Sequence, residues 1–357
     1  MPYATEPALA PEAPPRTAVL LVNLGTPDEP TPAALRRYLA EFLGDPRVVE
    51  IPKIVWWPIL HGLILRLRPA RSARKYATVW TPEGSPLAAW TARQATLLLG
   101  SLGERGHRVL VRHAMRYGNP SIASVLDDLK AQNVTRVLVL PLYPQYAAAT
   151  TGSTADALAA WLTRTRRLPD LRFVADYADD PGYIDALARR VTTHWAQNGR
   201  AERLLLSFHG LPVRSKLLGD PYDAQCKLTA QRLREALGLT EDRFLVTFQS
   251  RFGRAKWLEP YTEPTLVALA QQGLRSVDVM CPGFVSDCLE TLEEIDQEAR
   301  AAFLGAGGTD FRYIPCLNDS PAWIRALADL AERQMQGWGT AAPRAAAGGP
   351  GATPSRP

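Results

Sequence analysis

The residue whose type and position most favour chemistry is His209, in the stretch SFHGLPVRSKLLGDPY at 207–222. It follows a strand-like apolar run that ends near Leu206, and Gly210 and Pro212 predict a turn directly after it. Ligands of open parallel sheets bind beyond the carboxyl ends of the strands, so this histidine is expected to face a crevice. Its imidazole changes charge near neutral pH, which suits a general base. The alternative is a histidine that only hydrogen-bonds a loop carbonyl.

A second feature is the acidic run VMCPGFVSDCLETLEEIDQEAR at 279–300, where a helix is predicted to begin around 286–287. Its glutamates recur every four residues, at Glu290, Glu294 and Glu298. Like charges at that spacing destabilise an α-helix, whereas a π-type turn would align them, and such turns are frequent at functional sites. The run therefore favours a cation path or a general-base role for Glu290. The alternative is a capping box formed by Asp287 and Glu290, with the other acids on a solvated face.

Arginine and aromatic residues follow two other predicted strands, in MRYGNPS at 115–121 and LPLYPQYAAATTGS at 140–153. These residues are Arg116, Tyr117, Tyr143 and Tyr146. We expect them on the same rim as His209 and Glu290. Guanidinium groups bind carboxylates and aromatic rings pack on flat faces, so this rim suits a flat, apolar ligand that bears acid groups. The alternative for the tyrosines is the ordinary edge of a core.

The elements that must position these residues are strands alternating with amphipathic helices. Eight apolar runs predict strands, at 17–24, 107–115, 135–142, 171–177, 201–208, 243–249, 275–281 and 311–316. Such alternation is typical of parallel sheets covered on both faces. The runs divide four and four, which predicts two α/β domains with separate cores and a hinge near 170–180. There is no GxGxxG or Walker loop, so dinucleotide binding and phosphate transfer by a nucleophilic His209 are poorly supported.

Composition restricts the class of protein. The 357 residues are 46% hydrophobic and 22% charged with a net charge of +5, as in a soluble globular chain. The four cysteines form no CxxC pair, which favours reduced, buried thiols in a cytosolic protein over a disulfide scaffold, zinc site or iron–sulfur cluster. No basic–aromatic platform repeats, which disfavours nucleic-acid binding. Residues 1–16 lack the pattern of a signal peptide, and they and residues 338–357 are predicted to be disordered tails.

About 80 residues separate the first two predicted strands, and this insertion contains the apolar stretch IVWWPILHGLIL at 54–65. The stretch is too short to cross a bilayer, which takes about 20 apolar residues. Basic residues follow it, at Arg66, Arg68, Arg71, Arg74 and Lys75. The combination predicts either a lip that leans into an anionic membrane surface or a core helix with a solvated end.

With these segments identified, the chain resembles the ferrochelatase family over about residues 17–337. The similar blocks, in the family's order, are LLVNLGTPDEP, KYATVWTPEGSPL, MRYGNPS, LPLYPQYAAATTGS, SFHGLPVRSKLLGDPY, TFQSRFGRAKWLEP and FVSDCLETLEEI. The resemblance implies a lyase that inserts Fe²⁺ into protoporphyrin IX in the last step of haem synthesis. It also implies a chelatase-like α/β fold of two Rossmann-like domains, each with a four-stranded parallel sheet, over 17–175 and 176–337. The membrane-facing lip would lie at about 51–75.

The resemblance also implies the roles of individual residues. His209 and Glu290 match the family's active-site histidine and glutamate, as base and metal ligands, with porphyrin held in the cleft between the domains. Asp287, Glu294 and Glu298 would form an acidic path. Porphyrin-binding residues would be Arg116, Tyr117, Tyr143 and Trp257. The implied protein is cytoplasmic and peripheral at the inner membrane, a monomer or weak homodimer.

The chain also departs from some family members. Cys288 stands where some members carry a second histidine, which disfavours a relay of two histidines. No cysteine-bearing extension follows the last domain, so no [2Fe–2S] cofactor is expected. The block FVSDCLETLEEI resembles the Gram-negative type, which favours protoporphyrin IX. Coproporphyrin III, another tetrapyrrole chelatase and a non-catalytic tetrapyrrole carrier remain the alternatives.

Overall fold

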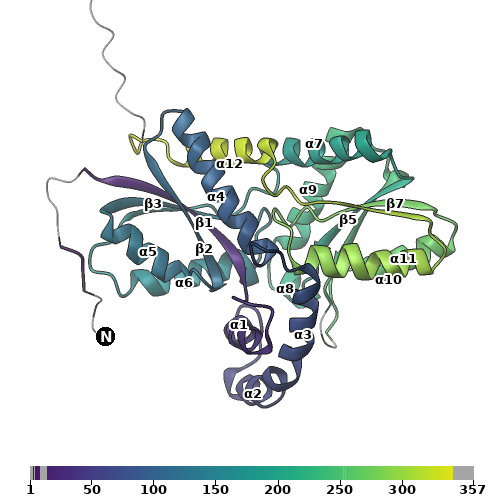
Figure 1. Ribbon diagram of the computed structural model, residues 1–357, viewed down its shortest axis with the longest axis horizontal. Helices are drawn as coiled ribbons and strands as arrows, with labels where there is room; N and C mark the ends of the chain where they lie inside the picture. Colours follow the sequence, from purple (N-terminus) through teal and green to yellow (C-terminus); the bar gives the residue numbers. More distant parts are fainter. Residues whose placement is uncertain (1–2, 4, 9–13, 252, 254, 341–357) are drawn as a thin grey trace, which may run out of the picture.

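A computed structural model describes residues 3, 5–8, 14–251, 253 and 255–340 of the chain. These residues form two four-stranded sheets (Figure 1). In chain order the strands are β1 (Arg16–Thr26), β2 (Val109–Gly118), β3 (Val134–Pro141), β4 (Asp170–Phe173), β5 (Arg203–His209), β6 (Phe244–Gln249), β7 (Ser276–Met280) and β8 (Asp310–Ile314). The eight predicted strands and their division into four and four are confirmed. β4 is shorter than predicted, because the backbone N–H of Tyr177 already donates to the carbonyl of Pro144, past the end of β3.

The two sheets repeat one topology. Their strand orders are β2-β1-β3-β4 and β6-β5-β7-β8, and every neighbouring pair is parallel. β1 and β5 are therefore equivalent central strands. Their side chains are almost entirely buried, as expected for a sheet covered on both faces.

Helices cover the sheets and form the insertion. The first half contains α1 (Pro32–Gly44), α2 (Lys53–Ile59), the π-helix η1 (Leu60–Ile64), α3 (Leu65–Val79), α4 (Pro86–Glu104), α5 (Ile122–Ala131), the π-helix η2 (Ala148–Gly152) and α6 (Ser153–Leu162). The second half contains α7 (Pro181–Asn198), α8 (Val213–Leu217), α9 (Tyr222–Leu237), the 3₁₀ turn η3 (Glu241–Arg243), α10 (Thr262–Gln271), the π-helix η4 (Glu290–Ala299), α11 (Arg300–Gly305) and α12 (Pro321–Gln334). Local caps fix several starts; the side chain of Asp180, for example, accepts from two amides of the first turn of α7.

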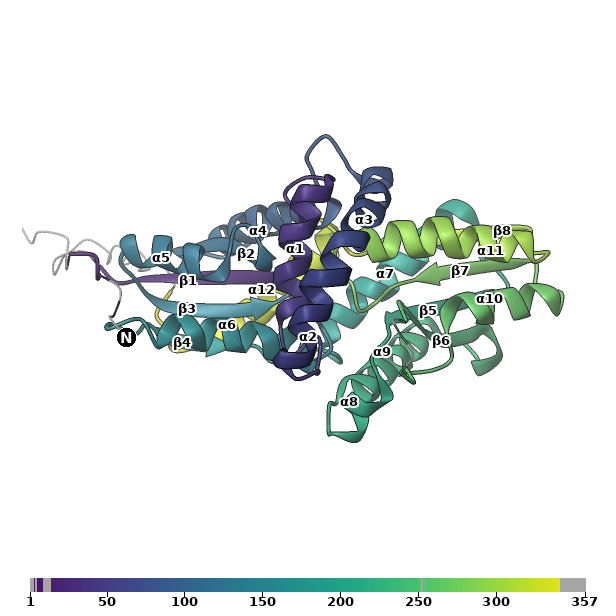
Figure 2. The ribbon, with the colours of Figure 1, turned by 90° about the horizontal axis from the view of Figure 1, so that it is seen from below.

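The insertion between β1 and β2 projects away from the sheets. Figure 1 shows α1, α2 and α3 below the two sheets, and Figure 2 shows them between the halves. A cluster that includes Tyr38, Leu60 and Tyr76 packs the insertion against Tyr117 of β2. α2, in contrast, buries none of its residues, so the alternative of a core helix fails for α2 and holds only for Leu60 and Leu65 further along the stretch.

The two halves share a core on one face. One hydrophobic cluster joins Val19 of β1 and Leu98 of α4 to Leu206 of β5 and Trp323 of α12. On the other faces each sheet has a cluster of its own. The expectation of separate cores therefore holds for one face only, because α12 packs on both α4 and α7.

The segments next to the tails make specific contacts. Glu6 forms an ion pair with Lys130 and accepts from the amides of Arg166 and Arg167, which lowers its pKa to about 2 through the Lys130 hydrogen bond first. Trp338 is buried and its indole donates to Asp170 at 2.7 Å. These contacts differ from the predicted disorder of residues 1–16 and 338–357; residues 1–2, 4, 9–13 and 341–357 lie outside the described residues.

Candidate functional site

The carboxyl edge of the second sheet brings His209 and Glu290 into one neighbourhood. His209 ends β5 and pairs with Gln249, the last residue of β6. The side-chain amide of Gln249 donates to the backbone carbonyl of Glu290 at 2.7 Å, and its carbonyl accepts from Ser207 at 2.7 Å. Gln249 thus fixes the start of the acidic helix beside the histidine. Gln249 stands at the end of a predicted strand in the block TFQSRFGRAKWLEP, and this position could have indicated it, although only Trp257 of that block was assigned a role.

The ring of His209 is held in one tautomer. Its Nδ1 lies 2.7 Å from the carbonyl oxygen of Gly210. A carbonyl oxygen can only accept, so Nδ1 carries the proton and Nε2 of the neutral ring carries the lone pair. The alternative interpretation, a hydrogen bond to a loop carbonyl, is therefore confirmed for one nitrogen. Within the described chain Nε2 has no hydrogen-bond partner, which leaves it available as a base or a metal ligand.

The acidic run adopts the π-helix that its spacing predicted. η4 covers Glu290–Ala299 and contains all three glutamates of the four-residue repeat. The capping box is absent, because the helix is preceded by Leu289 without a side-chain cap. The half-buried Glu290 therefore stands in the first turn of the helix without a cap to occupy it.

Two tyrosines of the insertion lie close enough to Glu290 for its charge to act on them. Tyr38 of α1 and Tyr76 of α3 are buried, and burial is the main cause that raises the pKa of both phenols. The negative charge of Glu290 raises both further, second in order for Tyr76. Both phenols therefore stay protonated, and we missed them in the sequence, although Tyr76 stands in the block KYATVWTPEGSPL.

The carboxylates of Glu294 and Glu298 bind different partners. Glu294 accepts from the amide of Ser250 at 2.6 Å and from its hydroxyl, and so holds the loop after β6, where Ser250 has a φ of 65°. Glu298 lies 2.9 Å from the ammonium of Lys75, which also contacts Glu293 at 2.7 Å. Lys75 thereby joins the insertion to the far part of the acidic helix.

Asp287 is a structural residue in this fold. It is 5% exposed, and its carboxylate accepts from the hydroxyls of Thr291 and Tyr313, from the amide of Asn318 at 2.6 Å and from the backbone of Cys316. These donors occupy both oxygens. The placement of Asp287 in the acidic path is therefore a prediction that its surroundings do not support.

The cysteines of the second half are neutral thiols. All four cysteines of the chain are buried and free. Burial raises the pKa of Cys288 well above its usual value, and the charge of the adjacent Glu290 raises it further. A protonated thiol is a weak metal ligand, which agrees with the prediction that disfavours Cys288 in place of a second histidine.

At the carboxyl edge of the first sheet, Arg116 and Tyr117 form a closed network. The guanidinium of Arg116 donates to Asp45 at 2.6 Å and to the hydroxyl of Ser153 at 2.6 Å. Tyr117 is fully buried and donates to the same oxygen of Asp45 at 2.8 Å. Burial raises the pKa of Asp45, but the bonds from Ser153, the Arg47 amide and Tyr117, together with the charge of Arg116, lower it overall. Asp45 was missed because it lies at the end of α1, far away in the sequence.

This network bears on the predicted ring-binding roles, which stay predictions. Nε and one terminal nitrogen of Arg116 donate to protein partners and Tyr117 is buried, so these contacts favour a structural part for both residues. Tyr143 lies beside Tyr117 and Arg116 and is 9% exposed. Trp257 is half-buried, and its ring would lie 3.2 Å from a Cβ added to Gly210, directly beside His209. Tyr146 is also half-buried, with its amide bonded to Gln225.

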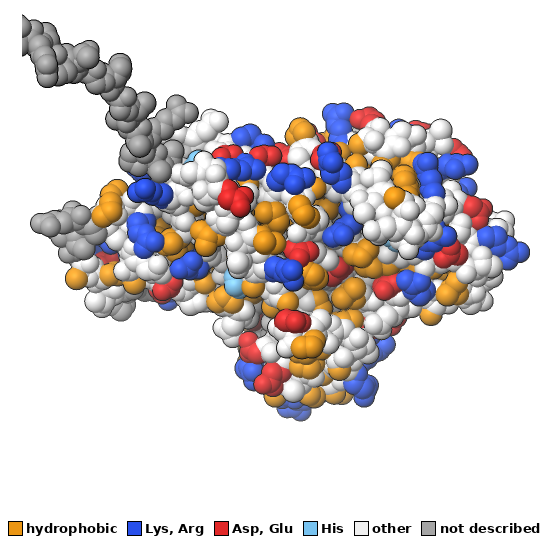
Figure 3. All heavy atoms as spheres, turned by 45° about the horizontal axis from the view of Figure 1, so that its top comes forward, with side chains coloured by type: hydrophobic (Ala, Val, Ile, Leu, Met, Phe, Trp, Pro, Cys, Tyr) orange, Lys and Arg blue, Asp and Glu red, His pale blue; other side chains and the backbone are white. Residues whose placement is uncertain are grey.

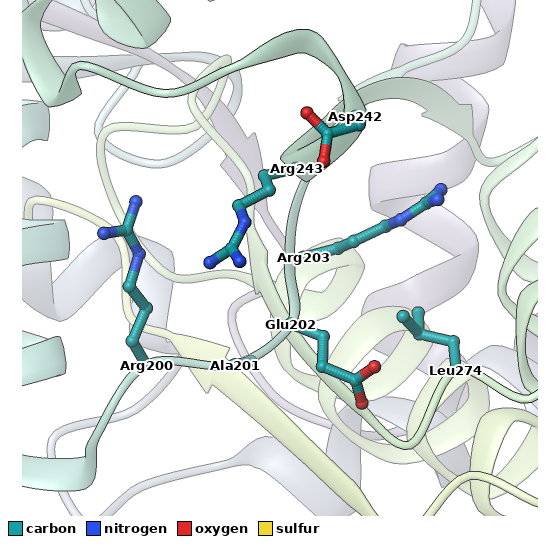
Figure 4. A pocket seen from close by; sticks show the side chains of 7 residues that line it. All are labelled: Arg200, Ala201, Glu202, Arg203, Asp242, Arg243 and Leu274. Atoms are coloured by element: carbon teal, nitrogen blue, oxygen red, sulfur yellow. The ribbon is translucent and has the colours of Figure 1, made fainter.

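No resident metal centre stands out in the structure. Across the described residues, no group of three or more His, Cys, Asp or Glu side chains is arranged to hold a metal ion. A hollow of about 420 Å³ lies at the opposite, amino ends of β5 and β7 (Figure 4). That hollow is far from His209, which stands at the carboxyl end of β5. The candidate site thus consists of His209, Glu290 and the groups that position them.

Comparison with known proteins identifies relatives over almost the whole chain. The family model described as Ferrochelatase matches residues 16–335. The ferrochelatase of Methylibium petroleiphilum is 68% identical over 340 residues, which cover 95% of this chain and 94% of that protein. The ferrochelatase of Polaromonas sp. is 64% identical over 348 residues, 96% of this chain and 95% of that protein.

Solved structures support the same fold at low identity. SirB from Bacillus subtilis with Fe³⁺ has a TM-score of 0.53 at 14% identity and covers 91% of this chain and 99% of that one. The sirohydrochlorin chelatase SirB of subspecies spizizenii, in complex with cobalt, has a TM-score of 0.52 at 13% identity over 91% and 97%. Likenesses at such identities concern the fold alone, and they confirm the predicted chelatase-like α/β architecture.

Proposed function

The chain belongs to the ferrochelatase family, and we propose that His209 and Glu290 carry out its reaction at the carboxyl edge of the second sheet. It is an enzyme of haem synthesis, a lyase that inserts iron into protoporphyrin. The reaction releases the two protons on the inner nitrogens of the free porphyrin and places the metal among four lone pairs. The site must therefore supply a proton acceptor and a route for a divalent cation.

The observation that carries the proposal is the tautomer of His209. With its proton on Nδ1, the ring offers the Nε2 lone pair, which can accept a pyrrole proton or bind ferrous iron. The carbonyl of Gly210 would also stabilise the imidazolium formed by proton transfer. The close packing of Trp257 over Gly210 restricts movement of this loop.

Glu290 is the second group of the proposed mechanism. Its backbone carbonyl accepts from Gln249, which places Glu290 beside the strand that bears His209, and its charge acts on Tyr38 and Tyr76. A carboxylate in this position can take the second proton or coordinate the incoming metal. Glu294, one π-turn further on, can extend this path, whereas Glu298 is neutralised by Lys75.

The first half has a supporting part in this proposal. Arg116, Tyr117 and Asp45 form a rigid wall, and we propose that this wall positions the ring-facing residues rather than gripping the propionates itself. Holding the macrocycle bent between a rigid wall and the base would move it toward the transition state. Tyr143 and Trp257 remain proposed ring contacts.

The insertion is proposed to rest on a membrane surface. Ile54 is 85% exposed, Leu67 68% and Trp57 63%, which is unusual for large apolar side chains. Arginines on α3 flank them, and Figure 3 shows orange and blue side chains together on this projection. No helix in the described part of the chain is long and apolar enough to cross a membrane. The proposed state is thus a cytoplasmic enzyme bound to the periphery of the inner membrane.

Vesicle sedimentation tests the membrane contact. Vesicles with anionic lipid should retain the protein at low salt, and high salt should release most of it. A Trp57→Glu variant should sediment at least tenfold less, whereas Leu168→Glu, a change at an exposed leucine outside the insertion, should behave like the parent. Equal sedimentation of the two variants would refute the proposed membrane contact of the insertion.

Two further proposals concern the oligomeric state and the cofactor. Sedimentation velocity can check whether the protein is a monomer or a weak homodimer, and analysis for iron and sulfide can check the expected lack of a [2Fe–2S] cluster.

The reaction itself is tested with His209→Ala under anaerobic conditions. Iron insertion, followed by the Soret and Q bands, should fall about 10³-fold, since a positioned general base contributes about 10² to 10⁴. Quenching of porphyrin fluorescence should still report binding. The control is His61→Ala on the insertion, which should retain its rate. Turnover within threefold of the parent in His209→Ala would remove this histidine from the mechanism.

A further inference from the structure

The hollow of Figure 4 gathers three arginines at the edge of the second sheet that the proposed reaction does not use. Its volume is about 420 Å³. The lining consists of Arg200, Ala201, Glu202, Arg203, Asp242, Arg243 and Leu274. Three loops supply these residues: the one after α7, the turn η3 before β6, and the one before β7.

The three guanidinium groups are only partly neutralised: the charge of Arg203 acts on Glu202, and the charges of Arg243 and Arg203 act on Asp242. Within the described chain, none of them forms an ion pair or a side-chain hydrogen bond. Other arginines of the same half are paired: Arg189 with Asp185 at 2.6 Å, and Arg232 with Glu235 at 3.2 Å. Clustered like charges repel, so an unpaired group of this kind favours a bound anion.

The two acids of the lining bond chiefly to groups of their own loops. One carboxylate oxygen of Glu202 accepts from the amides of Arg275 and Ser276, both at 2.9 Å. These backbone bonds, that to Ser276 first, lower the pKa of Glu202. Asp242 is held chiefly by the hydroxyl of Thr240, which lowers its pKa. Both acids stay charged, and their main bonds are to groups of the neighbouring loops. In Figure 4 the carboxylate of Glu202 points toward Leu274.

Two of the three arginines, Arg200 and Arg243, reach toward a common space, whereas Arg203 points away from it. Figure 4 shows the head groups of Arg200 and Arg243 reaching into the same opening from two sides. The guanidinium of Arg200 stacks 4.3 Å from the ring centroid of Trp195, a contact that reduces its freedom before any ligand binds. Planar guanidinium forks bind phosphate oxygens in pairs.

We propose that this hollow binds a small polyphosphate or organic phosphate, clamped by Arg200 and Arg243. Its volume lies in the range of about 300 to 1,000 Å³ that is usual for small-molecule sites, and exceeds what a single small anion needs. β5 begins at Arg203 and ends at His209, about 20 Å away at about 3.3 Å per residue. The anion site is therefore separate from the iron-insertion site and does not depend on the role proposed for it.

Calorimetric titration of the full chain with pyrophosphate and with ADP tests the proposal, and sodium chloride of matched ionic strength is the reference. We expect saturable binding and a rise in melting temperature with either phosphate. The variant Arg200→Gln/Arg243→Gln should bind at least tenfold more weakly. The matched control, Arg189→Gln/Arg232→Gln, removes the same charge from paired arginines of the same half and should bind like the parent.

The outcomes separate the sources of the anion. If pyrophosphate and ADP bind with equal affinity, the site recognises the phosphates alone. If ADP binds more tightly, the site also contacts the nucleoside. Binding by the double variant within twofold of the parent would overturn the proposal, as would a chloride effect equal to that of pyrophosphate. Iron insertion without added phosphate should be unchanged in the double variant, which verifies that it is folded.

Discussion

At the carboxyl edge of the first sheet, one oxygen of Asp45 accepts from Arg116, Tyr117 and Ser153, whereas at the same edge of the second sheet Nε2 of His209 has no partner in the described chain. Arg116 and Tyr117 lie on the edge strand β2 and His209 on the central strand β5, so the two groups share the carboxyl edge of sheets with the same strand order but not the equivalent strand. The hydrogen bonds to Asp45 hold the first group of residues in one arrangement, whereas the lone pair on Nε2 of His209 is available to accept a proton. The repeated architecture thus has two carboxyl edges, of which one carries a closed network and the other the proposed reaction site.

This contrast makes different predictions for substitutions at the two edges. Changes in the Asp45 network should act mainly on the free energy of unfolding. Changes at Glu290 should act mainly on the rate of iron insertion. A change at Lys75, which joins the insertion to the acidic helix, should have a small effect on both.

The largest effect on stability is expected for Asp45→Asn. The amide leaves the guanidinium of Arg116 without its counter-ion in a half-buried position, which costs about 3 kcal/mol. Urea unfolding at pH 7 measures this loss. Asp156→Asn, which breaks the exposed pair with Arg47, is the control and should change stability by less than about 0.5 kcal/mol. A destabilisation by Asp45→Asn as small as that of the control would mean that the wall is not held by this network.

The same carboxylate predicts a pH dependence. The folded-state pKa of Asp45 is lower than its unfolded value of about 3.9, so its contribution is complete above that value. It is lost as the pH falls through the folded-state pKa. The difference in unfolding free energy between the parent and Asp45→Asn should therefore be constant from pH 7 to about pH 5 and shrink in stronger acid. A difference that grows on acidification would contradict this assignment.

Glu290→Gln should lower the rate of iron insertion by about 100-fold, or about 2.7 kcal/mol of activation free energy, with little change in stability. The amide keeps the shape of the side chain but can neither accept a proton nor attract the metal. Anaerobic kinetics with and without excess Fe²⁺ measure the effect. The control Glu298→Gln alters a glutamate already paired with Lys75 and should stay within threefold of the parent. If the two variants lost the same activity, Glu290 would not be the distinctive carboxylate.

Lys75→Met is expected to have the smallest effect, a loss of about 1 kcal/mol in unfolding free energy. Burial already raises the pKa of Glu293, and Lys75 opposes this rise, so its removal leaves a largely buried carboxylate without its cation. Chemical denaturation measures the loss. Lys227→Met is a matched control, because Asp223 keeps Lys216 as its second partner.

The strands, the place of His209 at the end of one of them and the π-turn could be predicted because each depends on residues that are close together in the sequence. Continuous apolar runs, a turn after a strand and a four-residue repeat of glutamates can all be seen within about 20 positions. Asp45, Gln249 and Lys75 escaped because their roles come from distant pairing: Tyr117 and Asp45 are 72 residues apart, and Lys75 and Glu293 are 218 apart. Arg116 was assigned to a ligand for the same reason, since its protein partners cannot be read from its neighbours in the chain.

The last described residues, which follow α12, limit how the two halves can move apart. After α12, the chain returns to the first sheet, where Arg136 and Arg172 bind backbone carbonyls of the last residues and Trp338 lies under Arg172. Figure 1 shows α12 on the side of the molecule opposite the insertion. The two halves are thus joined on the side of α12, and on the opposite side the insertion is joined to the second half by the ion pairs of Lys75 and by that of Glu50 with Arg214. A widening of the cleft on the side of the insertion would have to break these ion pairs while α12 stays in place.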